Sequence, residues 1–442
     1  MPATWYSTYP YLCRTVWGRR VTGGSLVDAA QSPSEPGTTP PSRRRAAGLL
    51  RRLVAPERLY LGALGLTGLA AVMSVALPAA ERGELSANMV SATLGAAVGG
   101  LSLDTFLISR PAGWVQSRGR AYLIAILGVA VLLSGVAAAL LTAAAGVGAY
   151  LVGVGSAVGL TVFNTVSSLA LRQRSFGLVY AMRAASGAVL VAGYAALYAA
   201  GRLDGGVWSM VWLAVQWLSA FAVCGLVLVR LRRAGAAPAP TSTGADYRAD
   251  LLAAGSLHLG IFAQMMTLRF NQILVARFAG AGPLGVYALA VAALEFAQAG
   301  AVVRAQRILA DRDGGDGPDP TPAVVRAALP IALAAIAGLG VLGFLAPEYR
   351  HAWLLGLLLL PGSLATAAGK SWSALLLKRR GEKATTVVAV VTSAVAIPAY
   401  LGVIPWAGVV GAAVASSLAY AVHAFASRAS LRRAQPPNPG MV

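Results

Sequence analysis

Long apolar stretches alternate with short polar gaps along the chain from residue 59 to residue 427. A helix needs roughly 20 mainly apolar residues to cross about 30 Å of hydrocarbon, and it satisfies its own backbone groups there. The pattern therefore predicts an all-α polytopic membrane protein with about 12 transmembrane helices. The expected spans are 59–80, 86–108, 121–143, 147–170, 176–200, 207–229, 250–279, 284–303, 324–345, 352–377, 384–403 and 406–427.

Basic residues indicate the orientation of these spans, because they fall almost entirely into every second gap and basic loops stay on the cytoplasmic side. With the amino terminus inside, the outer gaps contain only Arg82, Arg202, Arg277 and Arg350. Both termini are therefore expected to be cytoplasmic. The inner gaps contain Arg110, Arg118, Arg120, Arg172, Arg174, Arg230, Arg232, Arg233, Arg304, Arg307, Arg312, Lys378, Arg379, Arg380, Lys383, Arg428, Arg432 and Arg433.

A segment rich in Pro, Ala, Thr, Ser and Gly between Arg230 and Arg248 divides the spans six and six. Such a linker favours two six-helix bundles that move against each other. Small-residue pairs such as Gly95 with Gly99 indicate close helix packing. The predicted domains are a disordered basic cytoplasmic tail (1–58), a first bundle (59–233), a cytoplasmic linker (234–249), a second bundle (250–430) and a cytoplasmic tail (431–442).

Composition excludes several other classes of protein. The chain is 57% hydrophobic and 12% charged, which is too apolar for a soluble globule. Its net charge of +20 is spread over topology-marking loops, so no nucleic-acid partner is expected. Cys13 and Cys224 lie far apart in sequence, the three histidines lack ligand spacing, and the acidic segment 311–319 does not match a calcium loop. We therefore expect neither a metal nor a cofactor.

Three segments of the second half resemble a known family. The first begins Arg269-Phe-Asn-Gln and includes Leu284-Gly-Val-Tyr; the second runs from Leu359 to Lys370, and the third from Ile404 to Tyr420. In order and span placement they are similar to the polysaccharide and lipid-linked oligosaccharide flippases, within the superfamily that also holds multidrug and toxin extrusion (MATE) transporters. The resemblance covers most of 250–430, whereas the first half offers only Arg82-Gly-Glu-Leu.

This resemblance implies a MATE-like pair of six-helix bundles that moves a lipid-linked glycan by alternating access. It also implies an anionic lipid carrier, with a glycan polymerase and glycosyltransferases as partner enzymes. The family usually has Asp where this chain has Asn271, so no proton or cation role is carried over to that position. The bias toward Ala, Gly and Arg is associated with a high-GC bacterium, so the expected location is the bacterial cytoplasmic (inner) membrane.

Polar residues within the predicted spans indicate where function lies, because ionisable groups are costly in hydrocarbon and generally face a cavity or a partner. In the seventh span, Arg269 and Gln272 are three positions apart and lie on one helical face, and Asn271 lies on an adjacent face. In the eighth span, Glu295 and Gln298 share a face. The predicted substrate cavity comprises Arg183, Arg269, Asn271, Gln272, Glu295, Gln298 and Lys370.

Each charged residue has two interpretations. Arg269 either binds an anionic lipid pyrophosphate bidentately or forms a structural ion pair with Glu295. Glu295 is a proton site or an ionised structural carboxylate. Arg183 and Lys370 either line the cavity or extend to the inner interface. Asp104 is a second ion-coupling candidate, or it pairs with a neighbouring loop arginine.

The leading hypothesis is a flippase for a lipid-linked oligosaccharide or polysaccharide precursor. The alternative is a multidrug exporter of the same superfamily, which should bury carboxylates in its first half, where only Asp104 is found. A membrane-embedded glycan polymerase or ligase is disfavoured because the outer gaps are short and the sequence shows no nucleophile, catalytic dyad or metal site. No catalytic residues are therefore assigned.

Overall fold

The computed structural model describes residues 56–109, 112–142, 146–172, 176–233, 244–310 and 319–433. These residues form helices and short connections, with no strand among them. The α-helices are α2 (Pro56–Met73), α3 (Ala79–Gly99), α4 (Leu103–Ser109), α5 (Ala112–Thr142), α6 (Val147–Arg172), α7 (Phe176–Ala199), α8 (Gly205–Arg233), α9 (Gly244–Phe278), α10 (Ala281–Ala297), α11 (Ala299–Ala310), α12 (Thr321–Leu345), α13 (Ala352–Arg380) and α14 (Glu382–Arg432), with short 3-10 turns η2 (Ser74–Ala76) and η3 (Pro347–Tyr349).

The predicted class, an all-α polytopic membrane protein, is confirmed. Seven described helices are long and apolar enough to span a membrane. One of them, α14, contains a kink at Gly408, whose φ of 54° and ψ of −133° are not helical, so this helix supplies two passes. Two of the expected spans, 86–108 and 284–303, are broken helices: α3 is followed by α4 after Leu101 and Ser102, which have positive φ, and α10 is followed by α11 after Gln298.

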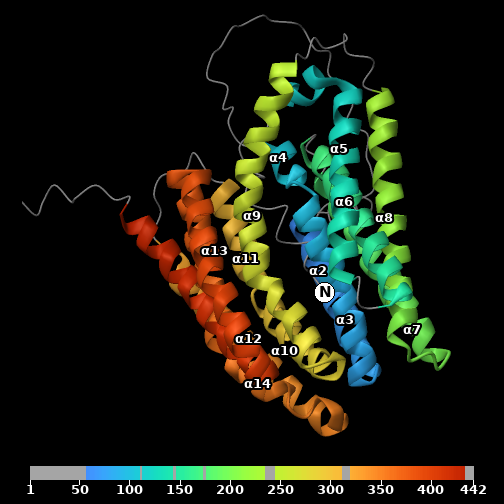
Figure 1. Ribbon diagram of the computed structural model, residues 1–442, viewed down its shortest axis with the longest axis vertical. Helices are drawn as coiled ribbons and strands as arrows, with labels where there is room; N and C mark the ends of the chain where they lie inside the picture. Colours follow the sequence, from blue (N-terminus) through green and yellow to red (C-terminus); the bar gives the residue numbers. More distant parts are fainter. Residues whose placement is uncertain are drawn as a thin grey trace, which may run out of the picture.

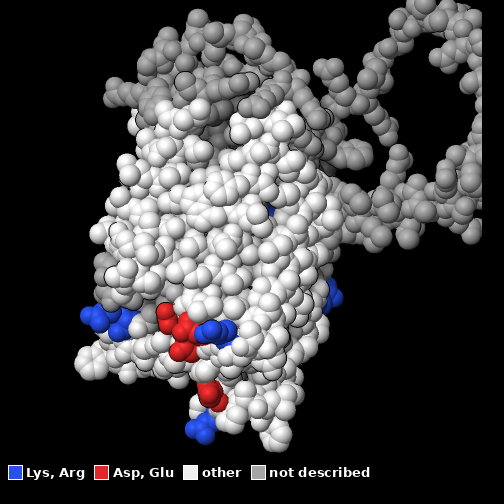
Figure 2. Space-filling model, turned by 90° about the vertical axis from the view of Figure 1, so that its right-hand side faces the viewer, with Lys and Arg blue, Asp and Glu red and all other residues white. Residues whose placement is uncertain are grey.

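Large apolar side chains cover the outside of the bundle. Phe344 is 88% exposed and Trp406 is 90% exposed, values typical of a soluble protein's charged residues rather than of its core. On the face drawn in Figure 2, a broad band nearly free of charged atoms lies above a group of acidic and basic side chains near the lower end. A hydrocarbon environment explains both features, because lipid contact makes outward apolar side chains favourable.

The helices form two groups that meet along α3, α9 and α10 (Figure 1). In the first group α2 packs on α7, α3 on α5 and α6 on α8; in the second, α13 packs on α14 and α12, and α14 on α9. Helices in lipid associate through close van der Waals packing, because lipid provides no hydrophobic driving force between them. A Cβ added to Gly95 would lie 2.7 Å from Ala138 Cβ, which bears out the expected role of this glycine.

The domain bounds remain a prediction, but the helix bounds bear on them. Helix α9 begins at Gly244, inside the segment 234–249 expected to be a linker, and α14 extends to Arg432. Residues 1–55 of the predicted tail, 234–243 of the linker and 434–442 of the second tail lie outside the described residues.

The two ends of the bundle differ. We call the end where α2 begins and α14 finishes the terminal end, and the opposite end, with the short connections from α2 to α3 and from α9 to α10, the turn end. At the turn end, α3 and α10 touch in a reciprocal way: a Cβ on Gly83 would lie 1.8 Å from the carbonyl oxygen of Ala281, and one on Gly285 would lie 2.1 Å from that of Ala79. The first residue of each helix thus contacts the fifth residue of the other.

Arg82 also joins α3 to α10 at the turn end, and its position corrects one sequence-based interpretation. The sequence placed it in an outer gap, but it lies inside α3 with none of its surface exposed. Its Nε donates to Ser74 Oγ at 3.0 Å and its Nη1 donates to the carbonyl of Gly285 in the other group. Tyr349 Oη also donates to the Leu77 carbonyl at 2.6 Å. These contacts close the turn end between the two groups.

Candidate functional site: a charged cavity between the two helix groups

A cavity between the groups contains the central charged pair. Arg269 Nη2 on α9 lies 2.7 Å from Glu295 Oε1 on α10, and the two side chains are only 5% and 12% exposed. By the helical rise of about 1.5 Å per residue, Arg269 is roughly 14 Å from the turn end of α9, about the depth of a bilayer centre. The cavity is lined by Ser86, Met89, Val90 and Thr93 of α3, Arg269 and Gln272 of α9, and Ala288, Val291, Ala292 and Glu295 of α10.

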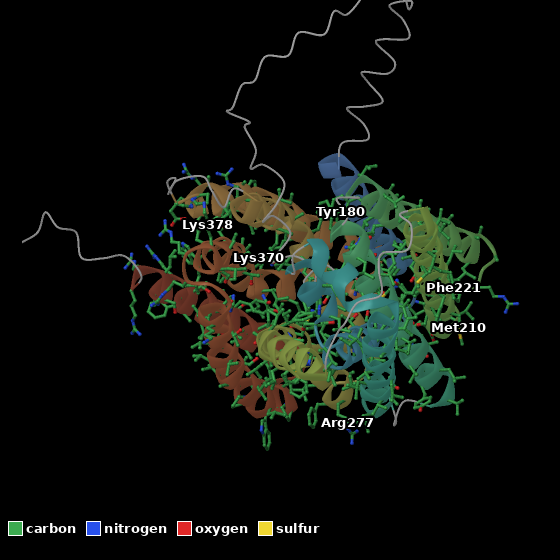
Figure 3. The ribbon with its side chains drawn as sticks, turned by 90° about the horizontal axis from the view of Figure 1, so that it is seen from above. Tyr180, Met210, Phe221, Arg277, Lys370 and Lys378 are labelled. Carbon is green, nitrogen blue, oxygen red and sulfur yellow. The ribbon has the colours of Figure 1, made fainter. Side chains whose placement is uncertain are left out.

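A second cation lies beside this pair, at the break between α10 and α11. Lys370 Nζ on α13 donates to Gln298 Oε1 at 2.8 Å, and Gln298 Nε2 donates to Ser363 Oγ at 3.0 Å. Lys370 is within electrostatic range of both Glu295 and Arg269. Figure 3, seen from the terminal end, shows Lys370 among the helices, whereas Phe221 and Met210 lie at the edge of the bundle. A broken helix with polar groups at its ends is a usual location for transporter binding sites.

Asn271 lies apart from that cavity, inside the second group. It is fully buried, and its Nδ2 donates to Tyr287 Oη at 2.7 Å and to Ser416 Oγ at 2.6 Å. Thr267, on the same face, exchanges a hydrogen bond with Ser393 of α14 at 3.0 Å. The face with Asn271 therefore packs on α14, while the face with Arg269 and Gln272 meets the first group. The spacing along the seventh span predicted two such faces, but Asn271 was expected in the substrate cavity and does not line it.

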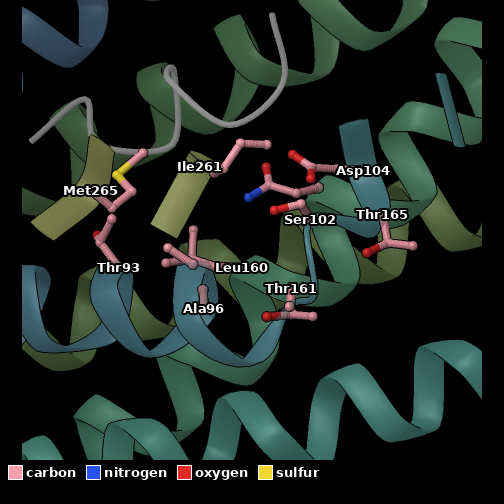
Figure 4. Close-up of a pocket in the computed structure, with 12 residues that line it drawn as sticks. Thr93, Ala96, Ser102, Asp104, Leu160, Thr161, Thr165, Ile261 and Met265 are labelled. Carbon is pink, nitrogen blue, oxygen red and sulfur yellow. The ribbon is translucent and has the colours of Figure 1, made fainter. Parts of the chain in front are cut away.

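Arg183 and Asp104 line two other cavities. Arg183, only 6% exposed, lies in a chamber of the first group, with its guanidinium carbon 5.5 Å from the Phe163 ring centroid. Asp104, also 6% exposed, lies in a cavity between α3, α4, α6 and α9 (Figure 4). Of the seven predicted cavity residues, the structure thus brings together Arg269, Gln272 and Glu295, with Gln298 and Lys370 beside them.

The contribution of α3 to this cavity could not be predicted from the sequence. Ser86, Met89 and Thr93 are short or uncharged, so nothing in their type distinguishes them from packing residues. Arg82 had a usable signal, because a Pro just before the first helical residue indicates that α3 begins at Ala79, with Arg82 in its first turn. Among the described residues, no group of three or more His, Cys, Asp or Glu side chains lies together to hold a metal ion.

Broken helices beside an interfacial cavity are found in many transporters, and comparison with solved structures shows which fold this chain has. The chain has the fold of the superfamily of lipid flippases and multidrug exporters, as expected from the sequence. One similar structure is the lipid II flippase MurJ in an inward closed conformation, with a TM-score of 0.59 and 11% identity over 85% of this chain and 87% of that chain. Another is an inward-facing multidrug resistance MATE family transporter of the MOP superfamily, with a TM-score of 0.50 and 12% identity over 84% of this chain and 94% of that chain.

No protein-family model matches the sequence, and no curated protein matches it either. The comparison thus establishes the fold.

Proposed function

We propose that this protein flips a lipid-linked oligosaccharide or polysaccharide precursor across the bacterial cytoplasmic membrane by alternating access. The buried charge between the two helix groups supports this proposal most strongly. Arg269 and Lys370 carry two positive charges and Glu295 one negative charge, so the group has a formal net charge of +1. Because an unbalanced positive charge is costly at this depth, an anionic headgroup would compensate it.

A pyrophosphate-linked glycan fits this chemistry. A guanidinium can hold two phosphate oxygens in parallel hydrogen bonds, and an ammonium provides a compact point charge beside it. When the headgroup enters, Arg269 exchanges Glu295 for phosphate oxygens, and Gln272 and Gln298 offer amide donors to the glycan. Transport then requires movement and no covalent step, so the proposal includes no catalytic residue. Enzymes that make or polymerise the glycan are the expected partners.

The proposed orientation has the terminal end in the cytoplasm and the turn end outside. The basic side chains that end α13, Lys378, Arg379 and Arg380, lie at the terminal end, as the positive-inside rule requires. With the turn end closed by Arg82 and the Gly83–Gly285 contact, this conformation corresponds to a state in which the headgroup is loaded from the cytoplasm.

Charge removal tests the proposal in cells that depend on this protein for surface polysaccharide. Arg269→Gln or Lys370→Gln should reduce export about tenfold or more, and the double variant should abolish it, since a hydrogen bond to a charged group is worth about 1.5–3 kcal/mol. Arg277→Gln is the matched control, because Arg277 lies exposed on the same helix and should tolerate the change. Normal polysaccharide in the double variant, at normal membrane abundance, would refute the cavity assignment.

A multidrug exporter is the second candidate. Two observations favour it: the fold is shared with a MATE transporter, and the carboxylate of Asp104, on α4 of the first group, is buried in a cavity between α3, α4, α6 and α9. Expression in a pump-deficient host distinguishes the two functions. A flippase leaves drug resistance unchanged, whereas an exporter raises it and loses the gain with Asp104→Asn.

A further inference from the structure

The chamber around Arg183 belongs entirely to the first helix group. Its cavity volume is about 80 Å³, which leaves room for several water-sized groups. It is lined by Thr67, Ala70 and Ala71 of α2, Leu85, Met89 and Thr93 of α3, Phe163 of α6, Arg183, Ser186, Gly187, Leu190 and Tyr194 of α7, and Trp212, Val215, Gln216 and Ser219 of α8.

The polarity of this chamber changes from one end to the other. Positions 183, 187, 190 and 194 recur at steps of four and three and so follow one face of α7 for about 16 Å. Arg183, the single charged side chain among the lining residues, lies toward the terminal end. Leu190, Met89 and Trp212 make the middle apolar.

The far end of the chamber offers a hydrogen-bonding group. Tyr194 is 1% exposed, and its hydroxyl has no hydrogen-bond partner among the described residues. A buried hydroxyl without a partner costs free energy, so a native structure usually provides one through a ligand or water.

We propose that this chamber is a second binding site, specific for an amphipathic anion. The headgroup, a carboxylate or a phosphate, lies at Arg183, with the Gln216 amide as an additional donor, and the apolar body extends along Leu190 and Trp212 toward Tyr194. An anionic lipid of the bilayer and a soluble amphipathic anion present the same chemistry. The proposal does not depend on the flippase function, because binding is measured without transport.

An occupant of this chamber would also touch the wall of the interfacial cavity. Met89 and Thr93 of α3 line both spaces. A ligand held against these side chains therefore stabilises α3, the helix that seals the turn end against α10. The two sites are connected by this shared wall.

Quenching of Trp212 by bromine reports binding directly. The protein is reconstituted in phosphatidylcholine nanodiscs and titrated with 10-bromodecanoate or, as the uncharged control, 10-bromodecanol. We expect saturable quenching by the anion alone, and its loss in Trp212→Phe. Arg183→Gln should raise the half-saturating concentration about tenfold or more. Arg183→Lys, which keeps the charge, should give an intermediate value, and Arg202→Gln, at an exposed arginine, should leave it unchanged.

A second arm identifies the source of the ligand. Replacing part of the nanodisc lipid by dibrominated phosphatidylglycerol should quench Trp212 in an Arg183-dependent way if the bilayer supplies the anion. Arg183-dependent quenching in either arm supports the site. If Arg183→Gln fails to fold, the proposal is tested with two other variants, Arg183→Lys and Tyr194→Phe. Each of them should weaken binding. Equal quenching by the alcohol, or quenching unaffected by the substitutions at Arg183 and Tyr194, overturns the proposal.

Discussion

Replacing Gly83 by alanine should hold the turn end open and stop transport while leaving the protein folded. The added Cβ would lie 1.8 Å from the Ala281 carbonyl oxygen and 2.4 Å from its carbon, and a backbone cannot move aside as a flexible side chain does. Overpacking of about 3 kcal/mol changes a two-state equilibrium roughly 100-fold against the closed conformation. Alanine is also a better helix former than glycine, so α3 itself is not weakened.

Labelling of a cavity cysteine measures this shift. Ala292 lines the cavity between the groups, and Ala292→Cys in a chain with Cys13→Ser and Cys224→Ser provides a single thiol. In intact cells, a membrane-impermeant maleimide should react faster when Gly83→Ala is added, and Gly285→Ala should act in the same way because the contact is reciprocal. Gly282→Ala is the control, since a Cβ there meets nothing within 4 Å. Equal labelling of all these variants would show that the glycine contact does not control access.

Replacing Glu295 by glutamine should lower the free energy of unfolding by about 3–5 kcal/mol, because it leaves the buried Arg269 without its carboxylate. Removing both charges, as Arg269→Met with Glu295→Met, should recover most of this loss, since well-packed apolar residues often replace a buried ion pair without cost. Urea unfolding in mixed micelles measures both effects.

The double methionine variant separates stability from function. We expect it to be folded and inactive in export, because the guanidinium that binds the headgroup is gone. If it were stable and fully active, the pair would be a structural feature only, the second of the two interpretations that the sequence allowed for Arg269.

The fold was largely predictable because a segment that crosses lipid must be a long, mainly apolar helix. Apolar length located the spans, and the spacing of polar residues separated two faces of α9. It did not tell which face lines the cavity: Arg269 and Gln272 meet the first group, whereas Asn271, expected beside them, packs on Tyr287 and Ser416. The breaks were only partly predictable. Gly99 and Gly100 signal the end of α3, but the residue types of Leu101 and Ser102 do not indicate the positive φ that both adopt.

The cavity was only partly predictable, because charge is visible in a sequence whereas the helix that faces it is not. Arg269, Glu295 and Lys370 stood out as ionisable groups in apolar spans. Arg183 stood out for the same reason, yet it lies in a different chamber, since sequence gives the depth of a side chain but not its neighbours across helices. Gly83 and Gly285 carry no chemistry, and only the reciprocal approach of α3 and α10 reveals their importance.

Movement of a fluorescent polyprenyl-pyrophosphate-linked oligosaccharide across proteoliposomes tests the central claim most directly. A membrane-impermeant glycosidase reports how much glycan becomes accessible, with a proton gradient and a membrane potential imposed. The account predicts transfer of the pyrophosphate-linked glycan by the native protein and none by the variant with Arg269→Gln and Lys370→Gln. Transfer no faster than in protein-free vesicles, or equal transfer by the variant, would contradict it.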